Sequence, residues 1–329
     1  MSVPSELARG VLAGERRQLS KAITLIESTK VADRKAAEAL MAALLPKTGN
    51  AARIGISGAP GAGKSSFIEA FGLQLIGEGH KVAVLAVDPT SAVSGGSILG
   101  DKTRMEELAR SDASFIRPSP SGRQLGGVAR RTREAMLACE AAGFDVVIVE
   151  TVGVGQSEAA VADMVDSFVL LIAAGAGDEL QGLKRGAIEL ADIVLVTKAD
   201  GALMDQAQRT CADYRSALRL MPRRLGSWRA RVELCSALKR TGIAEAWALI
   251  QQHRQGLEAS GALEAKRAAQ ARAWMWSEVK ATLLSELEQS AGIAELAERL
   301  EAKVEAGTLA PGAAAREILS AFAKRRGAG

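Results

Sequence analysis

A glycine-rich run ending in lysine and serine carries the clearest chemistry in the sequence. It matches the pattern G-x-x-x-x-G-K-[ST] in full, with Gly58, Ala59, Pro60, Gly61, Ala62, Gly63, Lys64 and Ser65. The N–H groups of such a loop turn onto phosphate oxygens, the lysine charges the β- and γ-phosphate site, and the serine hydroxyl binds Mg²⁺. The amides of Ser65 and Ser66 add to this anion site. A glycine turn without a ligand is the alternative, but the flanking strand and helix patterns favour nucleotide phosphates.

A second pattern indicates which base the nucleotide carries. Thr197-Lys198-Ala199-Asp200 follows an apolar run and resembles the N-K-x-D box of GTPases, with Thr in place of Asn. The Asp200 carboxylate can accept hydrogen bonds from N1–H and the 2-amino group of guanine, and adenine offers no such pair of donors. Lys198 would lie along the base. A later run resembles the S-A-L loop whose backbone N–H groups reach guanine O6, and it consists of Ser236, Ala237 and Leu238.

Each of these two patterns alone could be a solvated strand end. Their order after the phosphate loop favours guanine recognition, so the sequence predicts GTP and GDP as ligands in preference to ATP.

A carboxylate at a third strand end could face the metal. Glu150 ends an apolar run, and Gly153 follows three residues later, in the place of the D-x-x-G motif of GTPases. Glu150 would then face Mg²⁺ and its water, and the Gly153 N–H would sense the γ-phosphate. Val154 follows that glycine, so a water-positioning glutamine is absent from this place and Gln156 is the nearest alternative. We therefore expect slow unassisted hydrolysis, although Glu150 could also be a solvated carboxylate.

These residues must be placed by a sheet whose strands end near one another. About seven short apolar runs alternate with helical patterns, which is typical of βαβ units. They lie at 53–57, 81–87, 114–117, 144–150, 167–173, 192–197 and 231–235. Several are apolar almost throughout, as expected for strands covered by helices on both faces. The predicted fold class is therefore α/β, a P-loop NTPase with a mostly parallel sheet.

Helical patterns without strands occupy both ends of the chain. Apolar residues recur at helical spacing through the first 45 or so residues, and the chain beyond Thr241 is rich in Ala, Glu, Leu, Lys and Arg. We expect an N-terminal helical arm at 1–48, a GTPase domain at 49–258 and a C-terminal helical extension at 259–329.

Composition excludes several other classes of protein. The chain of 329 residues has 42 basic and 38 acidic residues, a net charge of +4 that is spread along the sequence and does not demand nucleic acid. Its three cysteines are far apart, which indicates neither a disulfide framework nor a zinc site. No apolar run reaches bilayer length and the amino terminus lacks the apolar region of a signal peptide. We expect a cytoplasmic protein that does not associate with membranes.

Longer motifs point to one family. They are D-P-T at 88–90, S-G-G-S-I-L-G-D-K-T-R-M at 94–105, E-T-V-G-V-G-Q-S-E at 150–158 and G-A-G-D-E-L-Q-G-L-K at 175–184. Together with the phosphate loop, they closely resemble the methylmalonyl-CoA mutase-associated GTPases of the MeaB type, whose older label is ArgK-like kinase. The resemblance covers nearly the whole chain, from the N-terminal helices to the helical tail.

The resemblance implies a guanine-nucleotide switch that binds an adenosylcobalamin-dependent acyl-CoA mutase such as methylmalonyl-CoA mutase. Such a protein gates delivery of the cofactor and protects the mutase from inactivation. Lys64 and Ser65 match the phosphate and magnesium groups of the family, and Asp200 matches its guanine reader. The acidic set near the metal is matched by Asp88, Asp101 and Glu150. Asp88 and Asp101 could instead cap a helix or turn, since each is next to Pro or Gly.

The family also implies a loop that links nucleotide state to the mutase. Gln181 and Lys184 match this loop, and the alternative for both is an ordinary exposed helix start.

An apolar stripe in the tail bears on oligomeric state. Its members recur at helical spacing and are Trp274, Trp276, Val279, Leu283 and Leu287. Core packing and a partner surface both fit this stripe. Family members are homodimers through such an extension, so the resemblance implies a homodimer.

Three other functions share the nucleotide chemistry. A metallochaperone GTPase would need soft or imidazole ligands, and the chain has only His80 and His253 and no close pair of cysteines. A P-loop kinase would fit the older family label, but Asp200 and the loop at 236–238 favour a switch with water as the acceptor. A nucleotide-dependent binding module without useful turnover would fit the missing glutamine after Gly153.

Overall fold

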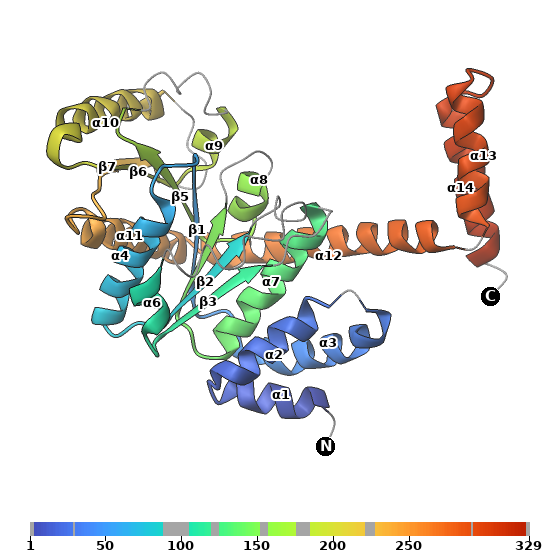
Figure 1. The fold of residues 1–329 in the computed structure, drawn as a ribbon, viewed down its shortest axis with the longest axis horizontal. Coiled ribbons are helices and arrows are strands. Elements are labelled where there is room, and N and C mark those ends of the chain that lie inside the picture. The colour runs from blue at the N-terminus through green and yellow to red at the C-terminus, as the bar shows by residue number, and fades with distance from the viewer. Residues whose placement is uncertain are drawn as a thin grey trace. The chain divides into compact units, whose positions relative to one another are not determined.

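The computed structural model describes residues 3–28, 30–87, 105–119, 125–151, 157–175, 185–220, 228–290 and 292–326. The chain forms two compact units, Met1–Gln270 and Ala271–Gly329 (Figure 1). The expected domain limits at 48/49 and 258/259 stay predictions.

A seven-stranded sheet forms the centre of the first unit, with the order β3-β2-β4-β1-β5-β6-β7. Its strands are β1 (Ala52–Gly58), β2 (Val82–Val87), β3 (Ser114–Ser119), β4 (Val146–Thr151), β5 (Ser167–Ala173), β6 (Ile193–Thr197) and β7 (Arg231–Leu234). Every neighbouring pair is parallel. The predicted α/β class and the seven strands are confirmed. β4 starts at Val146, two residues later than expected, because the Phe144 N–H donates to the Cys139 carbonyl at the end of the preceding helix.

Helices cover both faces of this sheet (Figure 1). One face carries α4 (Lys64–Gly77), α6 (Glu106–Arg110) and α11 (Ile243–Ala259), and the other carries α7 (Leu125–Ala141) and α8 (Ser157–Ala162). Further along the chain, α9 (Arg185–Leu190) contacts α8 and β5. The 3-10 turn at Gly201–Leu203 leads into α10 (Met204–Arg219), which packs on β6 and β7. This two-sided cover explains why β1, β4 and β6 read as nearly continuous apolar runs.

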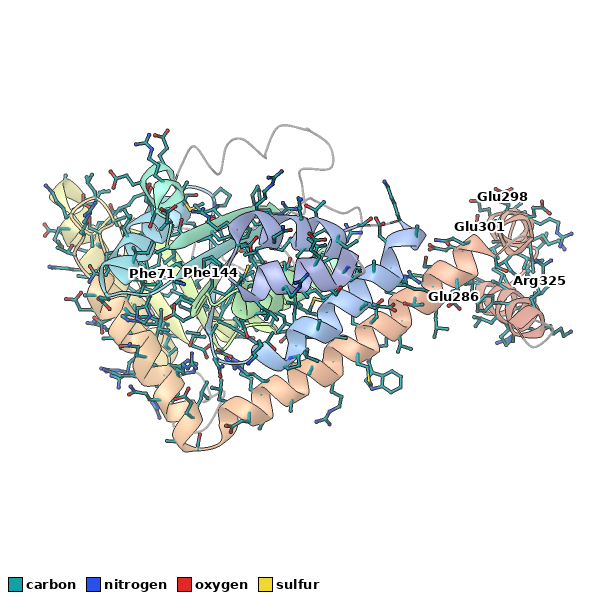
Figure 2. The ribbon with its side chains drawn as sticks, turned by 90° about the horizontal axis from the view of Figure 1, so that it is seen from below. Phe71, Phe144, Glu286, Glu298, Glu301 and Arg325 are labelled. Atoms are coloured by element: carbon teal, nitrogen blue, oxygen red, sulfur yellow. The ribbon has the colours of Figure 1, made fainter. Side chains whose placement is uncertain are left out.

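Aromatic packing fills the space between the sheet and α4. Phe67 and Phe71 stack with ring centroids 5.3 Å apart, and Phe71 meets the edge of Trp247 from α11 at 6.1 Å. Both phenylalanines are fully buried. Figure 2 shows Phe71 and Phe144 inside the first unit. These contacts hold α4, and with it the end of the phosphate loop, firmly on the sheet.

The N-terminal segment forms the predicted helices. They are α1 (Val3–Leu12), α2 (Arg16–Ile26) and α3 (Val31–Leu44), followed by a 3-10 turn at Leu45–Lys47, and all three helices contact α7. The Arg117 guanidinium of β3 donates to the Glu27 carboxylate at 2.5 Å, and Arg16 donates to the Ser111 carbonyl at 3.1 Å. The helices therefore pack against α7, and α2 is also linked to β3, so this segment does not stand apart from the first unit.

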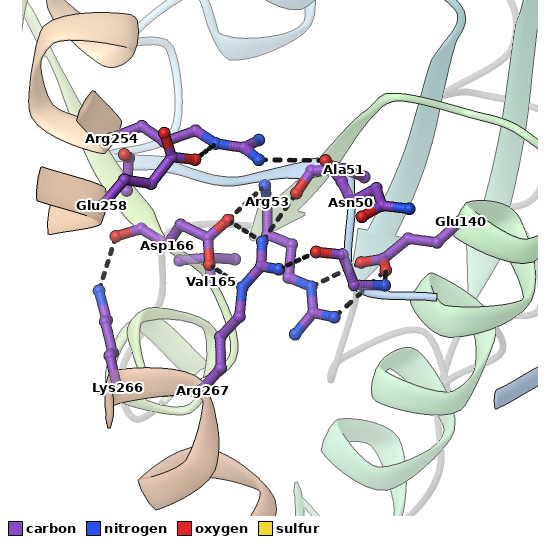
Figure 3. A network of polar contacts seen from close by, with 12 residues as sticks. Asn50, Ala51, Arg53, Glu140, Val165, Asp166, Arg254, Glu258, Lys266 and Arg267 are labelled. Carbon is purple, nitrogen blue, oxygen red and sulfur yellow. Dashed lines mark hydrogen bonds and ion pairs between the residues drawn. The ribbon is translucent and has the colours of Figure 1, made fainter. Parts of the chain in front are cut away.

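A polar network fixes the amino end of β1, at the edge of the sheet opposite the phosphate loop (Figure 3). The Arg53 guanidinium donates to Glu140 of α7, with 2.5 Å between Nε and Oε1. Arg267 donates to the Ala51 carbonyl at 2.8 Å, and Arg254 of α11 donates to the Asn50 carbonyl at 3.1 Å. The strand that carries the phosphate loop is thus anchored at its start by charged groups from several helices.

The second unit is helical. It contains the later part of α12 (Ala262–Gln289), then α13 (Ile293–Glu305) and α14 (Pro311–Arg326). Figure 2 labels Glu286, Glu298, Glu301 and Arg325 on these helices. Among its described residues, the buried apolar side chains are Ile293, Leu300 and Ala314. Within the described parts of the whole chain, no helix combines the length and apolar character needed to cross a bilayer.

Most of the apolar stripe of α12 lies open in the single chain. Trp276 is 55% exposed, and Val279 and Leu283 are each 39% exposed. Trp274 and Leu287 are half buried. Two explanations of this stripe were open, core packing and a partner surface. Packing in the core of a single chain does not account for Trp276, Val279 and Leu283, because all three are exposed.

Candidate functional site

The described candidate residues lie at one edge of the sheet. The strands are parallel, so the carboxyl ends of β1, β4, β6 and β7 point the same way, and ligands of such folds bind at this edge. In the register of β1 and β4, Glu150 lies beside Ile56, two residues before Gly58. The phosphate loop therefore starts next to the strand that carries the expected metal carboxylate.

The phosphate loop joins β1 to α4 through left-handed backbone. Gly61 has φ +81° and Gly63 has φ +83°, in the region that favours glycine. A Cβ on Gly58 would lie 2.4 Å from the Leu171 carbonyl oxygen, so a larger residue would not fit there. The spacing of glycines in the sequence thus follows from the backbone path.

Lys64 lies against the loop that it is expected to serve. Its ammonium Nζ donates to the carbonyls of Gly58 at 2.8 Å and Ala59 at 3.2 Å. Lys64 is also the first residue of α4, where the first backbone N–H groups have no carbonyl of the same helix to bind. Ser65, half buried, and Ser66, exposed, follow in the same turn. The Lys64 charge and the first N–H groups of α4 thus lie together at the end of the loop, as an anion site requires.

The expected base-reading residues are joined by hydrogen bonds across 36 positions of sequence. The Ser236 hydroxyl donates to Oδ2 of Asp200 and accepts from the Lys239 N–H at 3.1 Å. The Ala199 N–H donates to the Cys235 carbonyl at 3.1 Å. The backbone of Lys198 has φ +58°, an uncommon conformation for a residue other than glycine. The loop after β7 therefore holds the Asp200 carboxylate in one orientation.

The S-A-L loop has only part of its expected backbone available. The Ser236 N–H donates to the Thr241 carbonyl at 2.9 Å, and the Thr241 N–H donates back to the Ser236 carbonyl at 3.1 Å. Because its backbone groups are paired with Thr241, Ser236 contacts Asp200 through its side-chain hydroxyl. Of the expected contact with guanine O6, the N–H groups of Ala237 and Leu238 stay a prediction, and Leu238 is 81% exposed.

Sequence reasoning missed the role of Thr197, which it registered only as a departure from N-K-x-D. The Thr197 hydroxyl lies 2.7 Å from the Ala62 carbonyl of the phosphate loop and 3.2 Å from the Ile172 carbonyl of β5. The side chain is buried. The available signal was a hydroxyl at a strand end directly before the expected base-reading residues.

Thr151 was missed in the same way. Its hydroxyl donates to the Ser57 hydroxyl at 2.8 Å, and both residues are buried. This contact links the ends of β4 and β1. Glu150, directly before Thr151, is 7% exposed and lies between Ile56 of β1 and Ala86 of β2. The strand carrying the carboxylate is thus tied to the strand carrying the phosphate loop.

The expected magnesium set is placed only in part. Ser65 and Glu150 lie at the edge described above, and a hydroxyl and a carboxylate are oxygen ligands of the kind that Mg²⁺ prefers. These two groups fit the ion. The other two members of this set, Asp88 and Asp101, lie outside the described residues. So do Gly153, expected at the γ-phosphate, and Gln181 and Lys184, expected in the partner-coupling loop.

Comparisons with known proteins agree with this arrangement. Residues 19–292 match the family described as Methylmalonyl Co-A mutase-associated GTPase MeaB. GTPase ArgK of Escherichia coli is 50% identical over 283 residues, which cover 86% of each chain. The mitochondrial methylmalonic aciduria type A homolog of Mus musculus is 48% identical over 332 residues, covering 97% of this chain and 79% of that protein. A crystal structure described as LAO/AO transport system kinase matches with a TM-score of 0.77 at 40% identity, covering 98% of this chain and 97% of that one.

Proposed function

The chain belongs to the family of methylmalonyl Co-A mutase-associated GTPases, and we propose that it binds GTP and GDP with Mg²⁺ and hydrolyses GTP slowly until a partner is bound. The observation that carries this proposal is the placement of Lys64 and Asp200 at the same edge of one parallel sheet. A nucleotide whose triphosphate lies at Lys64 and whose purine lies at Asp200 accounts for the positions of both residues.

Each residue has a defined part in this reaction. The phosphate loop and Lys64 bind and orient the phosphates, and the Asp200 carboxylate, oriented by Ser236, accepts from the guanine N1–H and 2-amino groups. Ser65 and Glu150 would hold Mg²⁺, which neutralises charge that develops on the phosphates. Asp88 and Asp101 would complete the acidic set. Val154 follows Gly153 where other GTPases have a water-orienting glutamine, which is the reason to expect slow turnover without a partner.

Calorimetry with Mg²⁺ and each of GTP, GDP and ATP tests the nucleotide assignment. We expect binding of both guanine nucleotides and a preference over ATP of at least about 100-fold, because adenine lacks the donor pair that Asp200 accepts. Equal affinity for ATP would remove the basis of the assignment.

We further propose that the partner is methylmalonyl-CoA mutase or a related adenosylcobalamin-dependent acyl-CoA mutase. The protein would gate cofactor delivery to the mutase and protect it from inactivation, and Gln181 and Lys184 would couple nucleotide state to this contact. Support comes from the family description and from the name of the mouse relative. Purified mutase should bind the chain differently with GDP and with a non-hydrolysable GTP analogue, and should raise its GTPase rate. No binding in either state would contradict this part of the proposal.

A homodimer through the C-terminal helices fits the open apolar stripe of α12. Trp276 and Met275 are each more than half exposed, at 55% and 52%, and burying such side chains between two copies is favourable at about 25 cal/mol per Å². Light scattering after size exclusion should give twice the mass of the chain. Trp276→Ala with Leu283→Ala should shift it toward the monomer, while Leu220→Ala, an exposed leucine of the first unit, should not.

A kinase activity is the second candidate, because the solved structure with 40% identity is described as a transport system kinase. The two functions differ in the acceptor of the γ-phosphate. Labelled GTP incubated with the protein and cell extract should release inorganic phosphate without labelling another molecule.

We also propose that the protein hydrolyses GTP in the cytoplasm.

A further inference from the structure

We infer that the hydroxyl pair of Thr151 and Ser57 sets the position of the Glu150 carboxylate relative to the phosphate loop, so that the contribution of Mg²⁺ to nucleotide binding depends on this pair. The inference rests on the proposed function and adds two positioning residues to it. Neither hydroxyl would touch the nucleotide or the ion. Both would act by holding the end of β4 against the end of β1.

The pair lies where two neighbouring strands separate. The paired positions of β1 and β4 end at Ile56 and Glu150, although β1 continues to Gly58 and β4 to Thr151. The chain then turns to α4 after β1 and to α8 after β4, and these two helices lie on opposite faces of the sheet (Figure 1). A parallel sheet opens a crevice between two such strands, and ligands of these folds bind there.

A side-chain hydrogen bond joins the two strand ends at this crevice. The Thr151 hydroxyl donates to the Ser57 hydroxyl at 2.8 Å, one residue beyond the last paired position of each strand. Thr151 is fully buried and Ser57 is 1% exposed, so water does not compete for this bond. Removing one hydroxyl would leave the other buried without this partner, which is unfavourable and favours separation of the strand ends.

The pair acts from the face of the sheet opposite the expected metal carboxylate. Successive side chains of a strand point to opposite faces, so Thr151 and Glu150 do not share a face. Ile56, which lies beside Glu150, belongs to the core that includes Phe67 of α4. Glu150 is therefore on the side of α4, whose first turn carries Ser65. Thr151 can act on the ion only through the position of the β4 backbone.

Affinity for a non-hydrolysable GTP analogue, measured by calorimetry with Mg²⁺ and again with EDTA, tests the inference. The ratio of the two affinities reports what the ion contributes, whereas the affinity in EDTA reports the phosphate loop and the base site. Thr151→Val keeps the shape of the side chain and removes the hydroxyl, and Thr151→Ser restores it. Ser57→Ala removes the partner. Thr210→Val is the matched control, because Thr210 of α10 is also buried and is not part of the site.

We expect Thr151→Val and Ser57→Ala each to lower the ratio by about 5-fold and to leave the affinity in EDTA within about 2-fold of the wild type. Thr151→Ser and Thr210→Val should keep the wild-type ratio. Glu150→Gln, which removes the carboxylate itself, should lower the ratio by at least about 10-fold. Adding Thr151→Val to Glu150→Gln should lower it no further, because the pair acts through this carboxylate.

Thermal unfolding of each variant without nucleotide checks the fold, and Ser57→Ala carries the test if Thr151→Val does not fold. Four results would overturn the inference alone: a wild-type ratio in Thr151→Val or Ser57→Ala, an equal loss in Thr151→Ser, an equal loss of affinity in EDTA, or a further loss on adding Thr151→Val to Glu150→Gln. A wild-type protein that does not bind the analogue, or binds it equally with Mg²⁺ and with EDTA, would overturn the proposed function and this inference with it.

Discussion

The carboxylate of Asp166 and the guanidinium of Arg267 form a two-pronged ion pair, with 2.9 Å from Nε to Oδ1 and 2.6 Å from Nη2 to Oδ2 (Figure 3). Asp166 also accepts the Arg53 N–H of β1 at 3.0 Å. Burial alone lowers the pKa of Arg267, but hydrogen bonds to Asp166 and the charges of Asp166, Glu140 and Glu258 raise it above its usual value. The pair joins the turn before β5 to the first turns of α12.

Replacing Asp166 by asparagine should lower the free energy of unfolding by about 3 kcal/mol, because the Asp166 side chain is 2% exposed and the Arg267 charge would lose its partner. Urea denaturation measures this change. Glu106→Gln breaks the exposed pair with Arg110 and should change stability by less than about 0.5 kcal/mol. Equal effects of the two substitutions would show that the buried pair contributes no more than a surface pair.

His253 should make the protein less stable in mild acid. Its ring lies 2.8 Å from the Ser167 hydroxyl and is 1% exposed, and burial lowers its pKa below 6.5 although Asp192 opposes this. The unfolded chain therefore binds a proton at a pH where the folded chain does not, and stability is lost as the pH falls below 6.5. The slope for one group is at most about 1.4 kcal/mol per pH unit.

Urea denaturation at pH 7.5, 6.5, 6.0 and 5.5 tests this prediction. His253→Asn should be less stable than the wild type at pH 7.5, and the difference should shrink toward pH 5.5 because asparagine does not titrate. His80→Gln, which changes the other histidine, should not abolish this loss. A constant difference between wild type and His253→Asn at every pH would contradict the role of His253.

Lys64→Ala should weaken GTP and GDP binding by at least about 100-fold, since the ammonium contributes charge-assisted hydrogen bonds to phosphate oxygens. The fold should persist, because the buried, stacked rings of Phe67 and Phe71 hold α4 on the sheet. Fluorescent GDP titration measures the loss. Lys21→Ala, at an exposed lysine of α2, is the control and should bind normally. Undiminished binding in Lys64→Ala would count against the phosphate site.

Asp200→Asn should lower guanine-nucleotide affinity by about 100-fold and improve the relative affinity for xanthosine nucleotides, because the amide presents a donor where guanine also has one. Ser236→Ala should also lower guanine-nucleotide affinity, but by only about 5-fold, since it removes only the group that orients Asp200. Competition between GDP and XDP gives both values. An unchanged preference in Asp200→Asn would refute the assignment of the base reader.

Much of the site could be predicted because its signals are local. Gly58, Gly61 and Gly63 stand where the backbone turns, and Lys64 begins the helix that the pattern indicates. The strand before them is apolar because helices cover both of its faces. Strand ends were predicted less accurately, such as the start of β4, where a helix-ending hydrogen bond from the Phe144 N–H decides the boundary.

The sequence by itself determined the α/β class, the strands, the phosphate loop and the family, because each is written in a continuous stretch of residue types. Only the tertiary structure decided that Thr197 meets Ala62 across 135 positions, that Asp166 meets Arg267 across 101, and that Ser236 orients Asp200. Such pairs depend on the order of the strands and on how the helices pack. A single side chain carries no record of its distant partner, so these contacts exist only once the sheet has assembled.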